Sequence, residues 1–484
     1  MSSSRYATLQ PDMKPSSFST IHFVGIGGAG MSVLAHMFSA LGVTVTGSDA
    51  LETQVVRALR EEGINVQIPQ SADNVGQADA VIVSSAIRDD NPELVEARER
   101  NIPLFHRSQA LALLMRDRKA VAVAGAHGKT TTSAMIAVGS MMSGLDASFA
   151  IGGSVHTTDG PMSGGRVGTG DVLVAEADES DGSFLNYEPY IAVVTNVEPD
   201  HLDHYGTKEA FEQAFVSFAG HIQANGVLIA CADDPGAAQL AAAHVNNGKR
   251  TWTYGQDPTS SLRLVDLTQV AGTSKVRLSV AWETLETSAA DVPQGHAEFD
   301  IAAPGLHNAL NATGAFAALL YLGVDPTRAA HALEQFSGTG RRFEERGMVR
   351  SIRVVDDYAH HPTEVAALLR AARISAGNGR VGVVFQPHLY SRTRIFSTEF
   401  AQAFDLADFT VMCDIYAARE DHDPQVTPHM IAEHMNSPVK VILDKTQAAH
   451  ALADWAQPGD LVLTVGAGDV TELGAVILDR LAKD

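Results

Sequence analysis

Cysteine is almost absent from this sequence. Only two cysteines occur in 484 residues, Cys231 and Cys413, and each ends a short apolar run that is typical of a buried strand. Two isolated thiols of this kind argue against a disulfide framework and against a cysteine-based metal site. We therefore expect a protein of a reducing compartment, the cytoplasm.

Long apolar runs and an excess of basic residues are also missing. No uninterrupted apolar run approaches the ~20 residues that a membrane-spanning helix needs. The formal net charge of −22 repels nucleic acid and anionic membranes, so neither is expected as a partner. Residues 1–19 are polar and serine-rich without an apolar centre, which predicts a disordered tail rather than a signal peptide.

Glycine and apolar residues, in contrast, are present in the proportions of an α/β protein. The 41 glycines suit many strand-to-helix turns, and 45% apolar residues is ordinary for a globular chain. A length of 484 residues predicts two to four domains, each with its own core.

The segment VAVAGAHGKTTT, residues 121–132, has the pattern of a phosphate-binding loop. It predicts a buried strand (121–124), a glycine turn and a helix that opens with Lys129 and Thr130. Backbone N–H groups at such a helix start bind phosphate, the lysine neutralises it, and a threonine hydroxyl can reach Mg²⁺. The turn is shorter than in G-x-x-x-x-G-K-[ST], because Val123 stands where the first glycine would fall. The segment predicts binding of a nucleoside triphosphate.

Acidic and histidine side chains follow the next two expected strands. The strand at 172–175 runs into Glu176, and the strand at 191–195 runs into a loop that carries Asp200 and His201. The carboxyl ends of strands in an α/β sheet are where ligands bind. Oxygen ligands suit Mg²⁺, and an imidazole could complete a second metal site. Glu176 is the first choice as a ligand because it lies directly at the strand end.

The sequence GIGGAG at residues 25–30 fits the dinucleotide-binding pattern G-x-G-x-x-G. It lies between an expected strand (21–24) and an expected helix (31–41), and Asp49 follows the next strand. Glycines here let the backbone approach a diphosphate, and the acidic residue can accept a ribose hydroxyl. Taken alone, the motif fits NAD and other diphosphates about equally. The unit ends near Arg116, at half the usual size, which counts against a dehydrogenase.

The stretch PGLHNALNA predicts a helix whose first turns carry His307, Asn308 and Asn311. The two asparagines are three residues apart and therefore share a face of the helix. Amide and imidazole groups there could contact a base or a phosphate, although N-terminal capping would explain one of them equally well.

The segment SGTGRRFE, residues 337–344, marks the expected start of a third unit. Four short apolar runs predict the strands of this unit: residues 351–355, 381–385, 409–412 and 461–465. Polar residues cluster after two of these strands and predict an anion site: Tyr358, His360, His388, Arg392 and Arg394. The pattern is again that of an α/β layer with polar loops on one edge.

Taken in order, these motifs resemble the Mur ligase family, over essentially the whole chain from Ile21 onward. The resemblance is carried by HFVGIGGAGMS, GAHGKTTT, AEADESDGSF, TNVEPDHLDHYG, LHNALNA, GTGRRFE, DDYAHHPTEV and QPHLYSRTR. It implies three α/β domains: a Rossmann-like domain at 20–117 for a UDP-linked substrate, a P-loop ATPase-like domain with a parallel sheet at 118–338, and a Rossmann-like domain at 339–484 for an amino acid. It also moves the first glycine loop from NAD to the diphosphate of a UDP-sugar.

The resemblance further implies a reaction. ATP would phosphorylate the lactyl carboxylate of UDP-N-acetylmuramate, and the amine of L-alanine would attack the acyl phosphate. Mg²⁺ is expected at two sites, where Mn²⁺ can substitute. The alanine ammonium must first lose a proton, and both His201 and His360 remain open as the base. The chain is expected to be a monomer or a homodimer.

Site residues follow from the same motifs. The expected catalytic residues are Lys129, Glu176 and His201, and the expected metal ligands are Thr130, Glu176 and His201. The expected ATP site comprises Gly125, Ala126, His127, Gly128, Lys129, Thr130, Thr131, His307, Asn308, Asn311, Arg342 and Asp357. The expected UDP-substrate site comprises Gly25, Gly27, Gly28, Gly30, Ser48, Asp49, Ser84 and Ser85. The expected amino-acid site comprises Tyr358, His360, His388 and Arg392.

Three features depart from the family pattern. Ala126 stands where the family loop often has threonine, and Leu389 stands where some members have arginine, so neither contact is carried over. No counterpart is assigned for the carbamylated lysine that several Mur ligases use as a metal ligand. Two alternatives stay open. One is a related ligase that adds a preformed peptide to the same UDP-sugar, which the QPHLYSRTR segment disfavours, and the other is a nicotinamide-dependent dehydrogenase.

Overall fold

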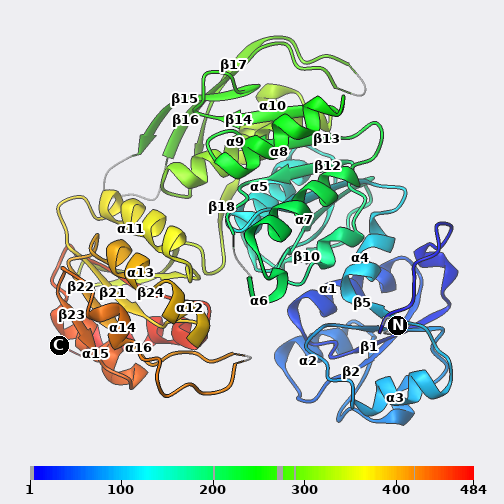
Figure 1. Ribbon diagram of the computed structural model, residues 1–484, viewed down its shortest axis with the longest axis horizontal. Coiled ribbons are helices and arrows are strands. Elements are labelled where there is room, and N and C mark those ends of the chain that lie inside the picture. The colour runs from blue at the N-terminus through cyan, green and yellow to red at the C-terminus, as the bar shows by residue number, and fades with distance from the viewer. Residues whose placement is uncertain (1–4, 200–201, 270–275, 288–289, 419, 484) are drawn as a thin grey trace.

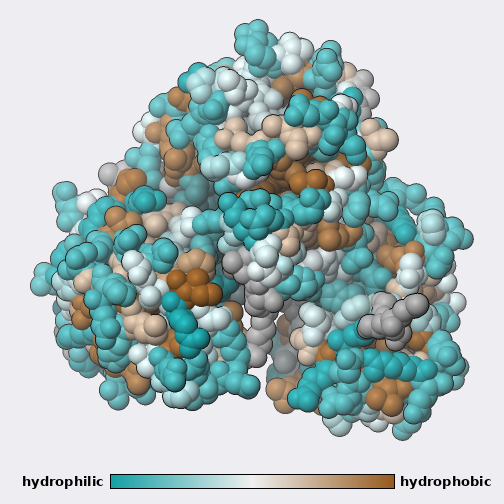
Figure 2. Space-filling model, in the orientation of Figure 1, coloured by the Kyte–Doolittle hydropathy of each residue, from teal (hydrophilic) through white to brown (hydrophobic). Residues whose placement is uncertain are grey.

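Three large sheets organise the chain into three lobes (Figure 1). The computed structural model describes residues 5–199, 202–269, 276–287, 290–418 and 420–483. The blue N-terminal lobe and the orange-red C-terminal lobe both lie below the green central lobe. The face in Figure 2 is mostly hydrophilic and is hollowed between the two lower lobes. The expected α/β fold with three domains is confirmed.

The N-terminal sheet consists of five parallel strands in the order β3-β2-β1-β4-β5. β2 and β3 lie on one side of β1, and β4 and β5 lie on the other, so the order of the strands reverses at β1. The carboxyl end of β1 carries the first glycine loop. The strands are β1 (Thr20–Val24), β2 (Thr44–Ser48), β3 (Asn65–Gln67), β4 (Ala80–Val83) and β5 (Leu104–His106). The helices are η1 (Pro15–Ser17), α1 (Ala29–Ala40), α2 (Gln54–Glu61), η2 (Ala72–Val75), α3 (Pro92–Glu99) and α4 (Arg107–Met115).

The segment before β1 differs from the expected disordered tail. Within the described residues it packs on the N-terminal domain: the Ala7 N–H donates to the carbonyl of Leu104 at 2.8 Å, and the Arg116 guanidinium donates to the carbonyl of Gln10 at 2.7 Å. Phe18 is only 8% exposed and meets the ring of Phe105 edge-on. Local composition predicted disorder because it does not include these contacts with distant residues.

The central sheet has ten strands in the order β10-β7-β11-β6-β12-β13-β14-β15-β16-β17. It is parallel from β7 to β15 and antiparallel at both edges. Its strands are β6 (Lys119–Ala124), β7 (Ser148–Ala150), β10 (Gly165–Arg166), β11 (Val172–Glu176), β12 (Ile191–Val194), β13 (Val227–Cys231), β14 (Thr251–Gly255), β15 (Leu262–Gln269), β16 (Val276–Trp282) and β17 (Gly295–Ile301). A small sheet joins β8 (Val155–Thr157), β9 (Gly160–Met162) and β18 (Phe336–Thr339).

The helices of the central lobe cover this sheet. They are α5 (Lys129–Met142), η3 (Ser183–Asn186), α6 (Leu202–Tyr205), α7 (Lys208–Gly220), α8 (Pro235–Asn246), α9 (Leu306–Tyr321) and α10 (Pro326–Leu333). The apolar run of β6 is buried from its second residue, as expected of a parallel strand covered on both faces. Since α5 packs against α9 as well as the sheet, it is buried almost all round. β6 lies between β11 and β12, so the loops after these three strands meet at one edge.

The C-terminal sheet has the order β19-β20-β24-β21-β22-β23 and is parallel except for β19. Its strands are β19 (Glu344–Val349), β20 (Ile352–Asp357), β21 (Val381–Phe385), β22 (Phe409–Met412), β23 (Val439–Val441) and β24 (Leu461–Val465). Its helices are α11 (Pro362–Ala376), α12 (Tyr390–Ile395), α13 (Ser397–Phe404), α14 (His429–Ala432), α15 (Lys445–Trp455), η4 (Asp469–Glu472) and α16 (Leu473–Leu481).

Cys231 and Cys413 are both buried and free, one at the end of β13 and the other just after β22. None of the helices in the described part of the chain has the length and apolar character that crossing a membrane requires.

Candidate functional site

The loop from Gly125 to Gly128 connects β6 to α5 at the centre of the large sheet. Gly128 has φ +82°, and a Cβ atom there would lie 2.7 Å from Oδ1 of Asn311 on α9. The left-handed backbone and this close approach both require glycine. The asparagine predicted to contact the nucleotide therefore lies directly against the phosphate loop.

Two residues after β12 hold the same loop in place. The His127 N–H donates to Oδ1 of Asn196 at 3.0 Å, and the amide of Asn196 donates back to the His127 carbonyl at 2.9 Å. The hydroxyl of Thr195 donates to that carbonyl as well. The residues that follow β12 thus fix the conformation of this loop.

Lys129 forms a buried ion pair at the start of α5. Its Nζ atom lies 2.8 Å from Oε2 of Glu179 and donates to the carbonyl of Gly125 at 2.7 Å. Burial opposes the charge on Lys129, but Glu179 and Asp178 outweigh it and raise the pKa of the lysine. Glu179 is fully buried, and this burial raises the pKa of its carboxyl group to about 7. A fixed cation is therefore present where phosphates are expected, with a carboxylate as its counter-ion.

Thr130 and Glu176 form the pair expected to bind metal. The Thr130 hydroxyl donates to Oε1 of Glu176 at 2.7 Å, and the Gly152 N–H donates to Oε2 at 2.8 Å. A hydroxyl and a carboxylate oxygen this close suit a hard cation such as Mg²⁺. The third expected ligand, His201, lies outside the described residues.

His127 links the central domain to the C-terminal domain. Its Nε2 atom lies 3.2 Å from Glu198, in the loop after β12, and its Nδ1 atom lies 3.2 Å from Glu364 on α11. Burial alone would lower the pKa of His127, but Glu364 and Glu198 raise it to about 9. The hydroxyl of Thr363 donates to Glu198 at 2.7 Å, which adds a second link between the two domains.

A cavity of about 1000 Å³ lies where the three domains meet. Arg107 of the N-terminal domain lines it and pairs with Asp178 of the central domain at 3.3 Å. The predicted site residues that line it come from all three domains: Gly30, Ala126, His127, Gly128, Lys129, Thr130, Glu176, Arg342, Tyr358, His360, His388 and Arg392. The cavity brings the phosphate loop together with the predicted amino-acid site.

A smaller cavity, of about 240 Å³, shares His127, Gly128, Arg342 and Glu364 with the large one. The predicted nucleotide residues that line it are His127, Gly128, Thr131, His307, Asn308, Asn311, Arg342 and Asp357. It therefore continues from the phosphate loop to the start of α9. The N-cap of α9 is Gly305, and the Asn308 amide instead donates to the carbonyl of Pro304.

Asp357 ends β20 on the wall of the smaller cavity. Burial raises the pKa of Asp357 to about 6, while Arg342 and two backbone N–H groups act in the opposite direction. These N–H groups belong to Phe343 and Ala359 and donate at 2.7 and 2.8 Å. The carboxyl group is thus held in a fixed orientation beside the expected nucleoside.

The predicted amino-acid residues lie together on the C-terminal side of the large cavity. The rings of His360 and His388 have centroids 5.9 Å apart, and a guanidinium nitrogen of Arg392 lies 3.4 Å from Nδ1 of His388. Tyr358 lies beneath two guanidinium groups, those of Arg341 at 4.7 Å and Arg342 at 5.1 Å. An anion entering here would meet a cluster of basic groups.

The N-terminal glycine loop is more distant from this cavity than expected. Of the predicted UDP-substrate residues only Gly30 lines the large cavity. Within the described chain, the other predicted UDP-substrate residues line neither of the two cavities: Gly25, Gly27, Gly28, Ser48, Asp49, Ser84 and Ser85. Gly125, which was predicted for the ATP site, also lines neither of them. The Gly27 N–H donates to Oδ2 of Asp49 at 2.9 Å, so the acidic residue binds the loop itself. The UDP-substrate assignment stays a prediction.

Several charged groups of the site were not predicted. Glu179, Glu198 and Glu364 pair with the phosphate-loop residues, Arg341 stacks on Tyr358, and Arg107 closes the N-terminal side. Four of these residues lie in the motifs EADESD, NVEPDH, HHPTE and GRR, close to residues that were expected to bind a ligand. That closeness in the sequence was the signal that could have identified them. Arg107 has no such signal, because only the packing of two domains brings it to the cavity.

The sequence matches three domain descriptions of one family. These are "Mur ligase family, catalytic domain" at residues 20–119, "Mur ligase middle domain" at 123–319, and "Mur ligase, glutamate ligase domain" at 341–468. The chain therefore belongs to the Mur ligase family.

Individual relatives are similar over nearly their whole length. The UDP-N-acetylmuramate–L-alanine ligase of Kineococcus radiotolerans is 50% identical over 469 residues, which cover 96% of each chain. The ligase of the same name from Paenarthrobacter aurescens is 50% identical over 468 residues, covering 96% of this chain and 98% of its own.

Two solved structures also match. A UDP-N-acetylmuramate-alanine ligase from Thermotoga maritima has a TM-score of 0.76 at 30% identity, covering 96% of this chain and 99% of the other. A murein peptide ligase from Psychrobacter arcticus has a TM-score of 0.66 at 26% identity, with the same coverage.

Proposed function

We propose that this chain is an ATP-dependent ligase that joins L-alanine to the lactyl carboxylate of UDP-N-acetylmuramate, a step of peptidoglycan precursor synthesis. One observation carries the proposal: the phosphate loop of the central domain faces the basic and aromatic cluster of the C-terminal domain across a single cavity of about 1000 Å³. The relatives that are 50% identical over almost the full chain support the choice of substrates. The oligomeric state proposed for the chain is a monomer or a homodimer.

The proposed domain boundaries are 20–117, 118–338 and 339–484. Two features of the chain support them. The last helix of the N-terminal sheet ends at Met115 and β6 begins at Lys119. β18 pairs with β8 of the central domain through Thr339, and β19 begins the C-terminal sheet at Glu344, which supports the second boundary to within a few residues.

The proposed reaction has two steps. A lactyl carboxylate oxygen attacks the γ-phosphorus of ATP, the bond to the bridging oxygen breaks, and ADP leaves. The nitrogen of L-alanine then attacks the carbonyl carbon of the acyl phosphate, and inorganic phosphate leaves with the bonding electrons. Transfer of a phosphoryl group between two anions depends on positioning and charge neutralisation, which a fixed lysine such as Lys129 provides.

Thr130 and Glu176 are the proposed ligands of Mg²⁺, with His201 proposed for a second metal and Mn²⁺ as a substitute. When bound, such a cation neutralises charge on the phosphates. The adenosine is proposed to occupy the smaller cavity beside Asn311 and Asp357, since that cavity opens onto the phosphate loop.

The amino acid is proposed to bind beside Arg392. The planar fork of an arginine suits a carboxylate and leaves the amine free to react. Arg392 is 6% exposed and lines the cavity together with His388. The proton lost from the ammonium needs an acceptor, for which His201 and His360 are the two candidates. Of these, the structure describes His360, whose ring contacts the rings of Tyr358 and His388.

Phosphate release from ATP would test the proposed function. We expect release with Mg²⁺ only when UDP-N-acetylmuramate and L-alanine are both present, and none when either is omitted or alanine is replaced by a preformed peptide. Release with the peptide alone would instead identify the peptide-adding alternative, related to the Psychrobacter arcticus protein. Oxidation of NADH without ATP turnover would identify a dehydrogenase.

A further inference from the structure

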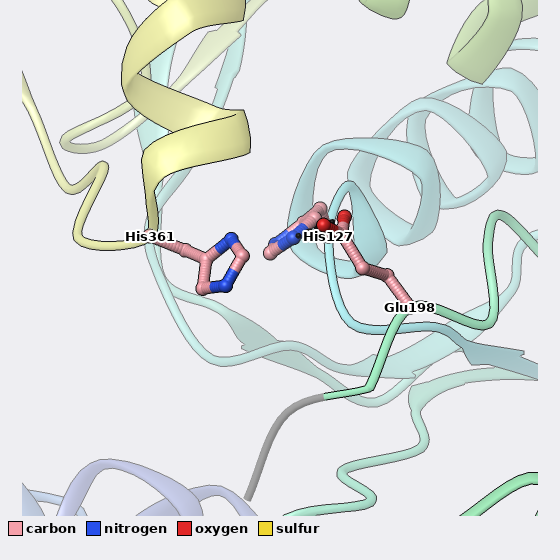
Figure 3. Close-up of side chains that lie close together, drawn as sticks. All are labelled: His127, Glu198 and His361. Carbon is pink, nitrogen blue, oxygen red and sulfur yellow. Dashed lines mark ion pairs between the residues drawn. The ribbon is translucent and has the colours of Figure 1, made fainter. Parts of the chain in front are cut away.

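Three side chains meet beside the phosphate loop on the side facing the C-terminal domain. His127 follows β6, Glu198 follows β12, and His361 precedes α11. One nitrogen or oxygen atom from each lies within 4.8 Å of the other two. Figure 3 shows the two imidazoles pointing toward each other, with Glu198 reaching the ring of His127. Two imidazoles and a carboxylate gathered this closely can ligate one divalent cation once small side-chain rotations bring each donor to about 2.1 Å from the ion.

The surroundings of His127 are those of a metal-binding histidine. Its Nε2 atom faces Glu198 at 3.2 Å, while its Nδ1 atom faces the carboxylate of Glu364 at 3.2 Å. Histidines that bind metal usually donate the second ring N–H to a carboxylate, which fixes the tautomer and orients the ring. Glu364 is the carboxylate that lies beside the second ring nitrogen of His127.

The ligands are also held in place before any ion binds. Asn196 holds the backbone of His127 by two hydrogen bonds, and Thr363 donates to Oε1 of Glu198, leaving Oε2 toward the ring. Glu364 accepts the backbone N–H of His361 at 3.2 Å. A site on such fixed elements loses little conformational freedom on binding.

Charge and donor type indicate the class of ion. With neutral imidazoles, Glu198 and Glu364 give the cluster a charge of −2. Of these two carboxylates, Glu364 also pairs with Arg342 at 3.7 Å and with His360 at 3.2 Å. A divalent cation bound to the cluster would balance this charge. Imidazole ligands favour Zn²⁺, Co²⁺ or Ni²⁺, whereas the oxygens of Thr130 and Glu176 favour Mg²⁺.

We propose that His127, Glu198 and His361 form a transition-metal site, distinct from the Mg²⁺ ligands Thr130 and Glu176. Because His127 and Glu198 belong to the central domain and His361 to the C-terminal domain, an ion bound there ties the two domains together. His127 and Glu198 line the smaller cavity, which provides the path of entry.

Cobalt is a suitable probe because its weak visible absorption bands strengthen and shift when protein donors such as imidazole replace its water ligands. The metal-stripped full chain, without a polyhistidine tag or nucleotide, is titrated with Co²⁺ in excess Mg²⁺ at about pH 8. We expect one equivalent of Co²⁺ to bind with visible bands. His361→Gln should lose the bands, and Glu364→Gln should bind roughly 10- to 100-fold more weakly.

Two matched variants make the test specific. His360→Gln, one residue earlier in the same loop, should keep the bands, and so should Glu176→Gln, which lacks the Mg²⁺ carboxylate. Co²⁺ should also raise the thermal unfolding temperature of the wild type but not that of His361→Gln, whose folding is checked by circular dichroism. Wild-type bands in His361→Gln, their loss in Glu176→Gln, or no Co²⁺ binding with Mg²⁺ present would each overturn the proposal. The readout needs no ligase substrate, so it is independent of the proposed reaction.

Discussion

The two glycine loops of this protein each connect a parallel strand to a helix, but the charged side chains around them differ. Each follows a central parallel strand and opens a helix, β1 and α1 in one domain, β6 and α5 in the other. In the first loop a backbone N–H donates to Asp49, and the first turn of α1 has no charged residue. In the second, Lys129 and Thr130 each face a carboxylate, Glu179 and Glu176.

This difference explains why the glycine pattern alone leaves the ligand open. Glycines provide only close approach of the backbone to a phosphate group, and this is common to NAD, a UDP-sugar and ATP. The side chains around the loop decide what the phosphate does. A lysine at the helix start can stabilise a phosphoryl group in transfer, whereas the first turn of α1 supplies no such charge.

The largest effect is expected for Lys129→Ala. Removing the fixed charge at the transferring phosphoryl group should lower kcat by roughly 10²- to 10³-fold, about 3–4 kcal/mol, as for the loss of one oxyanion donor. Binding of the UDP-sugar should be unchanged, because the other glycine loop is intact. Phosphate release and calorimetry measure the two effects.

The matched control for this variant is Lys119→Ala at the exposed start of β6, where the lysine pairs with Asp171. It should turn over at the wild-type rate. Near-native turnover in Lys129→Ala would show that the central loop has been assigned the wrong role. The presence of a lysine at only one of the two loops would then not explain a difference in their function.

A smaller effect, on the other loop, is expected for Gly27→Ala. The new Cβ would lie 2.9 Å from Oδ2 of Asp49 and 2.9 Å from Cγ2 of Val56, so the loop or α2 must shift. Overpacking of this kind costs about 1–3 kcal/mol, and KM for the UDP-sugar should rise roughly 10- to 100-fold. KM for ATP should not change.

The control is Gly220→Ala, at the end of α7, where the added atom meets open space. Steady-state kinetics with each substrate varied in turn separates the outcomes. A rise in KM for ATP, or no change for the UDP-sugar, would mean that the first loop does not serve the substrate assigned to it.

Much of the fold could be predicted from the sequence, because its strands are short apolar runs that end in glycine or polar turns. The expected strands at 381–385, 409–412 and 461–465 coincide with β21, β22 and β24. The antiparallel strands β15 to β17 could not be assigned, since polar residues interrupt their apolar pattern. Residues 5–19 were missed for a different reason, namely that Phe18 finds its partner Phe105 far along the chain.

The residues of the site also fall into two groups, those that local structure positions and those that contacts between distant parts of the chain position. Lys129, Thr130 and Glu176 could be predicted because each lies at a strand end or helix start, where local geometry fixes its direction. Glu198 and Glu364 are 166 residues apart and come together only through docking of the C-terminal domain on the phosphate loop. Counter-ions of this kind have no spacing rule, so only the structure can identify them.

The smallest effect is expected at the counter-ion of the central loop, and it tests whether Glu179 competes with phosphate for Lys129. The pKa of the Glu179 carboxyl group is raised to about 7 from its ordinary 4.5, so in the folded protein its charge appears only as the pH rises through about 7. Wild-type affinity for sulfate, a phosphate mimic that does not titrate in this range, should therefore increase as the pH falls from about 8 to 6.

Glu179→Gln should bind sulfate at about pH 8 more tightly by roughly 1–2 kcal/mol, or about 5- to 30-fold, because a like charge has been removed. It should also lose most of the dependence on pH. Displacement of a fluorescent ADP analogue measures the affinity, Lys129→Ala gives the baseline, and Glu188→Gln on the exposed surface is the matched control. Weaker sulfate binding in Glu179→Gln would mean that the carboxylate positions the lysine for phosphate instead of competing with it.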